Sequence, residues 1–197
     1  MPDEAVQGAS RIGRPRRGDV DQALSLAVLE LLHSGGPAAV TMQAVAQASG
    51  LAKTTVYRRH PDRSALLRAV LDESIGTPVP PPAGTVREKV RWCLREAWRQ
   101  MADVLGPGGL AAVIGDASPE FTAVFRSVLE PYDRALVDLI RADVGAGLLR
   151  PEVDADAVVS MFLGAYLGEL VRRGSVDEQW LDRCLDLMWA AVAPVQD

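Results

Sequence analysis

The stretch GLAKTTVYRRHPDRSALLRAVL, residues Gly50–Leu71, carries the strongest structural signal in this sequence. Its first part predicts a short helix that follows a glycine turn and ends before Pro61. The segment just before it, VTMQAVAQASG, predicts another short helix, which Thr41 begins and Gly50 ends. Two short helices separated by a glycine turn are typical of a helix-turn-helix, a layout found in many DNA-binding domains.

Helical spacing of apolar residues extends this unit in both directions. The segment DVDQALSLAVLELLHSGG predicts a helix that is capped by Asp19 and is ended by Gly35, Gly36 and Pro37. Residues 62–75 predict a fourth helix with its own apolar face. We therefore expect a helix-turn-helix domain over residues 19–75.

The segment GTPVPPPAG, residues 76–84, predicts a linker, because three consecutive prolines exclude a helix. Beyond it, apolar residues again recur at helical spacing, and no segment alternates as a strand would. The glycine-rich residues 106–118 predict a loop with at most one short helix, and Pro131 is expected to kink or divide a helix. The predicted fold is all-α with about nine helices, and residues 85–197 form a second helical domain.

Charge separates the two ends of the chain. The sequence has a formal net charge of −5, yet residues 10–68 hold eight Arg and one Lys against three Asp and one Glu. Four of these arginines lie in RIGRPRRG, residues 11–18. A basic front on an acidic chain indicates a nucleic-acid surface at that end. We expect residues 1–18 to be a flexible basic arm, with a purely solubilising tail as the alternative.

The predicted helix after Gly50 has the residues that a DNA-reading helix needs. Lys53, Thr54 and Thr55 lie at its N-terminal end, where base edges meet a helix in the major groove. A phenol and cations that bind phosphate follow at Tyr57 and Arg58. The alternative is an ordinary solvated helix face.

Residues Gly50–Leu71, together with the preceding VTMQAVAQASG, resemble the helix-turn-helix signature of the TetR family of bacterial transcriptional regulators. The sequence departs from the family pattern in two places. Ala52 stands where Ser or Thr usually caps the helix. Arg59 and His60 stand where the family usually has His followed by a bulky aromatic residue. The segment GRPRR resembles the core of an AT-hook, which implies an arm that enters the minor groove. The residues that we expect to contact DNA are Arg14, Arg16, Arg17, Thr41, Gln43, Lys53, Thr54, Thr55, Tyr57, Arg58, Arg59, His60 and Arg63.

The resemblance implies a homodimeric repressor that binds a palindromic operator on double-stranded DNA and is released by a small, largely apolar effector. It implies a ligand cavity among the C-terminal helices and a dimer interface on the last two, although aromatic stripes at helical spacing are more often core. The candidate cavity residues are Trp92, Trp98, Met101, Phe121, Phe125, Tyr132, Phe162 and Tyr166. The candidate dimer residues are Val158, Leu170, Trp180, Cys184 and Met188.

Other functional classes find little support in the sequence. No nucleophile–base pair, glycine-rich phosphate loop or metal-ligand cluster is evident, so we expect no enzyme, cofactor or metal site. No apolar run is long enough to span a membrane, and two isolated cysteines suit a reducing cytoplasm. The remaining alternative is a helical interaction protein whose basic N-terminal region binds RNA or an acidic protein partner.

Overall fold

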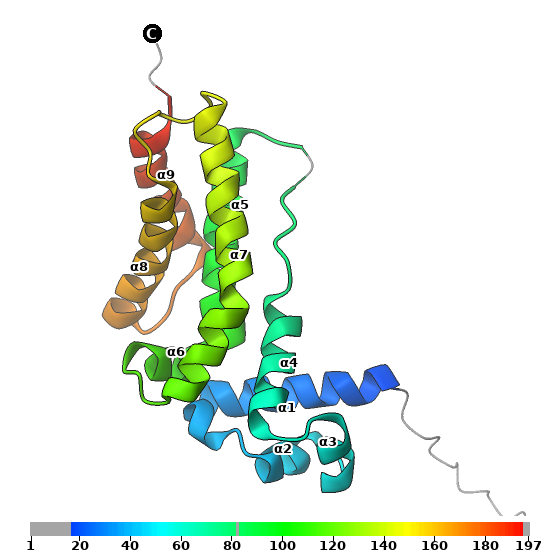
Figure 1. Cartoon of the computed structure of the whole chain (residues 1–197). Helices are drawn as coiled ribbons and strands as arrows, with labels where there is room; N and C mark the ends of the chain where they lie inside the picture. The colour runs from blue at the N-terminus through cyan, green and yellow to red at the C-terminus, as the bar shows by residue number, and fades with distance from the viewer. Residues whose placement is uncertain (1–16, 82, 195–197) are drawn as a thin grey trace, which may run out of the picture.

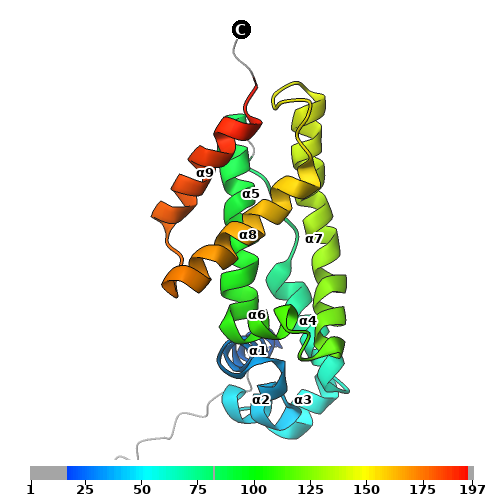
Figure 2. The same ribbon diagram turned by 90° about the vertical axis from the view of Figure 1, so that its left-hand side faces the viewer.

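The computed structural model of the chain describes residues 17–81 and 83–194. Within these ranges every regular element is a helix, as the sequence predicted. Helices α1 to α4 gather at one end of an upright bundle, with α1 lying across that end and α4 rising from it (Figure 1). Helices α5 and α7 run lengthwise, and α8 and α9 cover one side (Figure 1 and Figure 2). The elements are α1 (Arg17–Ala39), α2 (Met42–Ser49), α3 (Lys53–Arg59), α4 (Arg63–Ile75), α5 (Val86–Arg99), the π-helical segment η1 (Gln100–Leu105), α6 (Gly106–Ile114), α7 (Pro119–Gly145), α8 (Ala155–Arg173) and α9 (Glu178–Val192).

Helix α1 differs from the prediction at its start and follows it near its end. It begins at Arg17, so Asp19 lies in the first turn and is not the cap. A carboxylate in the first turn still interacts favourably with the positive end of the helix dipole. At Gly36 the backbone leaves the helical region (φ 66°, ψ −172°), which interrupts the helix where the glycines and Pro37 predicted its end.

The α2–turn–α3 unit forms as its local signals predict. The Thr41 side chain accepts a hydrogen bond from the backbone N–H of Ala44 at 3.1 Å, and this bond caps α2. Gly50 ends α2 in the left-handed conformation (φ 68°, ψ 13°), which glycine adopts without steric cost. Ala52 precedes α3 without a side-chain capping bond, as its methyl group requires. Helix α4 is capped by Asp62, whose carboxylate accepts from the N–H of Ala65 at 2.8 Å.

The glycine-rich segment contains the one short helix that the sequence allowed for. It forms α6, which follows η1 directly and packs against α1. A Cβ atom on Gly108 would lie 2.5 Å from the carbonyl oxygen of Leu32 and 2.6 Å from the backbone nitrogen of Gly36. The absence of a side chain at Gly108 therefore lets α6 approach the backbone of α1, and this contact joins the two halves of the molecule.

The linker and the long helices complete the bundle. Residues 76–85 contain no helix among the positions that the structure describes, and the chain then enters α5 through a capping box formed by Thr85 and Glu88. Helix α7 continues from Pro119 to Gly145 through Pro131, so the proline does not divide it. The helix forms on both sides of Pro131 because its apolar face is buried on either side of that position.

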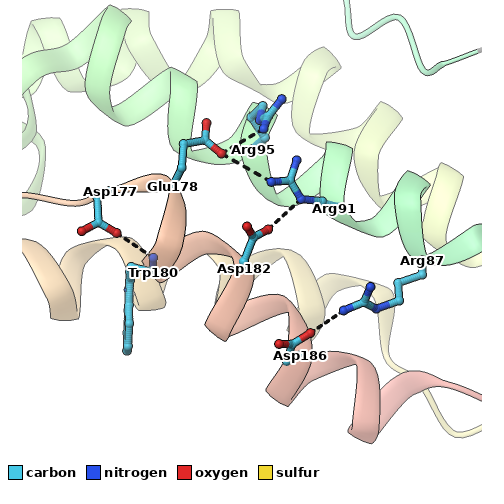
Figure 3. A network of polar contacts seen from close by, with 8 residues as sticks. All are labelled: Arg87, Arg91, Arg95, Asp177, Glu178, Trp180, Asp182 and Asp186. Atoms are coloured by element: carbon cyan, nitrogen blue, oxygen red, sulfur yellow. Dashed lines mark hydrogen bonds and ion pairs between the residues drawn. The ribbon is translucent and has the colours of Figure 1, made fainter.

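A ladder of ion pairs aligns α9 with α5 (Figure 3). Arginines on α5 and carboxylates on α9 recur every four residues, so they meet along facing sides of two antiparallel helices. The pairs are Arg87–Asp186, Arg91–Asp182, Arg91–Glu178 and Arg95–Glu178. The hydrogen bond from Arg91 lowers the pKa of Asp182 below its usual value. Because these groups are solvent-accessible, the ladder fixes the register of α9 more than it adds stability.

The described part of the chain contains neither a membrane-spanning helix nor a cluster of metal-binding side chains. None of its helices combines the length and the apolar character that crossing a bilayer requires. None of its His, Cys, Asp and Glu side chains gather in a group that could hold a metal ion.

Candidate DNA interface and ligand cavity

The polar face of α3 consists of Lys53, Thr54, Tyr57 and Arg58, whose side chains are all exposed. Tyr57 is 51% exposed although its ring is large and apolar. The opposite side of the helix is held by Val56, which is completely buried. The polar face therefore presents a small hydroxyl, a phenol and two cations together, which are the donors that bind base edges and phosphates.

Helix α2 and its cap add two polar residues beside this face. The Lys53 ammonium donates a hydrogen bond to the side-chain oxygen of Gln43 at 3.2 Å, which orients the lysine at the start of α3. Thr41 is exposed, and its hydroxyl oxygen is used in capping α2. Its hydroxyl hydrogen remains able to donate to an external acceptor.

Three further residues that we expected at the interface are turned toward the protein. Thr55 is half-buried, and Arg59 forms an ion pair with Asp21 of α1. His60 is partly buried; burial and the neighbouring Arg59 charge lower its pKa, so the imidazole is neutral at pH 7. The ion pair of Arg59 thus connects the end of α3 with α1.

Arg63 also has intramolecular partners. Its guanidinium donates to the carbonyl oxygen of Val40 at 2.8 Å and to that of Pro37 at 2.6 Å, and it lies 3.6 Å from a carboxylate oxygen of Glu120. These bonds join the start of α4 to the connection between α1 and α2 and to α7. Carbonyl groups near the interrupted end of a helix lack the N–H partners that a continuing helix would supply. Arg63 donates to two such carbonyls, those of Pro37 and Val40. The expected arm residues Arg14 and Arg16 lie outside the described residues, and Arg17 is the first residue of α1.

An apolar cavity of about 180 Å³ lies between α5, η1, α6, α7 and α8. Three residues expected at a ligand site, Met101, Phe125 and Tyr132, line it. The Tyr132 hydroxyl donates to Glu96, and burial together with that carboxylate raises the pKa of Tyr132 to about 12. The lining residues that the sequence reasoning missed are Ala97, Gln100, Leu105, Leu110, Val113, Ile114, Leu129, Asp133, Leu136, Val159, Leu163 and Leu167.

The other aromatic residues lie elsewhere. Phe121 and Phe162 are completely buried in the core. Trp98 and Tyr166 meet edge to face, 5.7 Å between ring centroids, and line a separate, more open cleft between α5 and α9. The Trp98 indole donates to the carbonyl of Phe162 at 2.8 Å, which fastens α8 to α5. Trp92 packs half-buried against the core.

Helices α8 and α9 present apolar side chains to solvent. Met161, Val171 and Leu187 are 57%, 85% and 74% exposed. The residues that we expected on this face are less available, because Val158, Cys184 and Met188 are buried within the protomer and Leu170 and Trp180 are partly covered. Helical periodicity identified the apolar faces of these helices. The packing of α8 and α9 on α5 determines which apolar side chains face outward.

Two family models match the chain. The model described as bacterial regulatory proteins of the tetR family matches residues 26–70, and the model described as the tetracyclin repressor-like C-terminal domain matches residues 80–188. No curated protein sequence matches the chain significantly.

Solved structures give the same picture of the fold. The TetR family transcription regulator SCO0332 is 26% identical, with a TM-score of 0.58 over 89% of this chain and 100% of its own. FadR from Bacillus subtilis in complex with stearoyl-CoA is 16% identical, with a TM-score of 0.64 over 85% and 96% of the two chains. A putative regulator from Saccharomonospora viridis in complex with choline is 13% identical, with a TM-score of 0.66 over 91% and 100%.

Proposed function

The chain belongs to the TetR family of bacterial regulatory proteins, and from this premise we propose that it is a homodimeric repressor that a small, largely apolar ligand releases from a palindromic operator. Membership makes it a DNA-binding transcriptional regulator, and neither family match is to a catalytic family. The observation that carries the proposal is the exposed polar face of α3, in a chain that also holds an apolar cavity.

DNA binding is assigned first to the polar face of α3. We propose that Lys53 and Thr54 approach base edges, while Tyr57 and Arg58 bind phosphates on either side of the groove. Thr41 and Gln43 support the same face from α2, and Thr55 lies at its border. Arg59 and Arg63 act mainly by holding α3 and α4 in place, because their contacts within the protein already use them, and His60 lies partly buried beside Arg59. The arm at residues 1–18, with Arg14, Arg16 and Arg17, is proposed to enter the adjacent minor groove.

We assign the dimer interface to the outer faces of α8 and α9. Met161 and Val171 on α8 and Leu187 on α9 are exposed apolar side chains, which a partner would remove from water. A second copy related by a two-fold axis would cover it with the same residues, as closed homodimers do. The ion-pair ladder supports this assignment because it holds α9 in a fixed position on α5.

The domain division follows from these roles. We propose an arm at residues 1–18, a DNA-binding domain at 19–75, a linker at 76–84 and a ligand-binding and dimerisation domain at 85–197. The ligand would bind in the cavity of about 180 Å³ and favour a separation of the two α3 helices that does not fit DNA. The protein would act in the cytoplasm, where its operator lies.

Retention of DNA from a genomic pool tests the proposal. Purified protein is mixed with duplex genomic fragments and, separately, with RNA of the same origin, and the retained molecules are sequenced. We expect one or a few duplex fragments that contain a palindrome, and loss of retention in the Lys53→Ala, Arg58→Ala double variant. Equal retention of RNA would favour the interaction-protein alternative. Transcription in vitro from a retained promoter then distinguishes repression from activation.

A further inference from the structure

The open cleft that Trp98 and Tyr166 line is separate from the apolar cavity. It lies between α5, η1, the loop that joins α8 to α9, and the start of α9. Its volume is about 320 Å³, which falls within the range of small-molecule sites. It shares no lining residue with the apolar cavity, and none of the exposed residues assigned to the dimer interface lines it. An occupant of this cleft would therefore leave both of those surfaces free.

Tyr166 brings an unpaired hydroxyl to the cleft. Its side chain comes from α8, is only 9% exposed and lines the cleft. The edge-to-face contact with Trp98 holds the ring in place. The hydroxyl forms no hydrogen bond with any residue that the structure describes. The hydroxyl of a tyrosine buried to this extent usually has a partner, so this group indicates an occupant of the cleft that can bond with it.

A carboxylate without a cation accompanies this hydroxyl. Asp103 lies on η1, is exposed and lines the cleft. Burial and the Asp103 charge raise the pKa of Tyr166, so the hydroxyl is protonated at pH 7 and its oxygen can accept a hydrogen bond. Among the residues that the structure describes, no cation forms an ion pair with Asp103. The cleft thus combines an acceptor oxygen with a negative charge that nothing in the described chain neutralises.

The overall charge of the cleft also favours a cation. Four carboxylates and two guanidinium groups line it, an excess of two negative charges. Both guanidinium groups are already paired, because Arg95 binds Glu178 (Figure 3) and Arg99 binds Glu96. Asp177 contributes a further carboxylate, which caps α9. An anion in the cleft would meet net repulsion, whereas a cation would relieve it.

We propose that this cleft is a second ligand site, which binds a primary ammonium group carried on an apolar body. The ammonium group has three N–H donors, which serve the Asp103 carboxylate and the Tyr166 hydroxyl oxygen. The apolar body lies against the apolar members of the wall, which include Ala102 and Val176. Because the two sites share no lining residue, this assignment does not depend on whether the apolar cavity takes an effector.

Three compounds with the same phenyl body test the charge preference. At pH 7, 2-phenylethylamine is a cation, 2-phenylethanol is neutral and phenylacetate is an anion. Binding to the full chain is measured by equilibrium dialysis. We expect the amine to bind about tenfold more tightly than the alcohol, and phenylacetate to bind most weakly. The preference should shrink at high salt, because Asp103 is exposed and its charge is screened.

Two variants in the cleft and two outside it locate the site. Asp103→Asn should abolish the preference for the amine, and Tyr166→Phe, which removes only the hydroxyl, should weaken amine binding about fivefold. Asp116→Asn removes the same charge from an exposed position outside the cleft and should keep the preference. Leu163→Met changes the wall of the apolar cavity and should also keep it.

The outcomes separate this site from the apolar cavity, for which naphthalene serves as the probe. Equal binding of the amine and the alcohol overturns the inference. A preference that survives in Asp103→Asn, or that Asp116→Asn lowers as much, also overturns it, as does unchanged amine binding by Tyr166→Phe. Naphthalene binding without preference for the amine leaves only the apolar-ligand proposal standing. Amine binding that meets all these expectations, without naphthalene binding, supports the second site alone.

Discussion

Tyr57 is exposed on α3 and has no part in the core, so its role in DNA binding can be tested without disturbing the fold. Tyr57→Phe removes one hydroxyl. We expect affinity for all duplexes to fall by a similar factor, equivalent to about 1 kcal/mol for one lost phosphate hydrogen bond. Fluorescence anisotropy titrations against several duplexes measure this. A changed sequence preference at unchanged affinity would assign the tyrosine to base recognition instead.

Arg63 is expected to behave differently, because its two backbone carbonyl partners belong to the fold. Lysine lacks the planar guanidinium fork that places separate nitrogens against the two carbonyls. Arg63→Lys should lower the free energy of unfolding by about 2 kcal/mol, measured by urea denaturation. Arg58→Lys, on the exposed polar face, is the control and should leave stability nearly unchanged. If Arg63→Lys were fully stable but bound DNA poorly, Arg63 would be a phosphate ligand and not a fold residue.

Cys93 lies in the core and should be chemically inert in the folded protein. Burial raises the pKa of its thiol to about 12, so almost none of it is the reactive thiolate at pH 8. We expect Ellman's reagent to react with it at pH 8 only after unfolding in guanidinium. Rapid reaction of both cysteines in the native protein would show that α5 and α9 open far more readily than their packing indicates.

At the scale of the elements, the packing of α6 on α1 depends on Gly108. Gly108→Ala would place a methyl group against the backbone of α1, with atoms only 2.5 Å and 2.6 Å away. We expect a loss of about 1–3 kcal/mol in unfolding free energy, because neither backbone can yield as a flexible side chain would. Gly145→Ala is the control, since its Cβ would meet nothing within 4 Å, and it should be neutral or slightly stabilising. Equal stability of the two variants would mean that α6 does not need its close approach to α1.

The sequence predicted the helices whose caps, turns and apolar spacing are encoded in their own residues. The cap at Thr41, the glycine turn at Gly50 and the regular apolar spacing are local, so the α2–turn–α3 unit followed from them. The glycines of α6 have a low helix propensity, so the sequence allowed one short helix there without fixing its bounds, and the need for Gly108 comes from the contact with α1. That contact is tertiary, and spacing along the chain does not reveal it.

The candidate DNA interface could be predicted in part from the sequence, and the ligand cavity could not. The polar face of α3 could be read from one helix, but the partners of Arg59 and Arg63 come from distant segments, and only the fold brings them together. The residues that line the cavity could not be predicted, because the apolar face of each helix contains both core residues and lining residues. Gln100 gave no signal in sequence, because its burial in the cavity wall depends on how η1 packs in the fold.

At the scale of the whole molecule, the dimer depends on the exposed side of α8 and α9. Leu187→Arg places a charge in the proposed interface at a position that is 74% exposed in the single chain. We expect a folded monomer in sedimentation experiments, with weaker operator binding because two linked half-site contacts are lost. Val79→Arg, equally exposed but on the linker, is the control and should remain dimeric. A Leu187→Arg variant that stays dimeric would place the interface elsewhere.

The most direct test of a two-fold DNA-binding regulator is a hydroxyl-radical footprint on a duplex that the protein retains from the genomic pool. Two copies of α3 that read the major groove on one face must bind half-sites a whole helical turn apart, about 34–36 Å or a multiple of it. We predict two protected segments with that spacing, related by the symmetry of the palindrome, with both lost in the Lys53→Ala, Arg58→Ala double variant. A single asymmetric footprint, or protection that this variant preserves, would contradict the account.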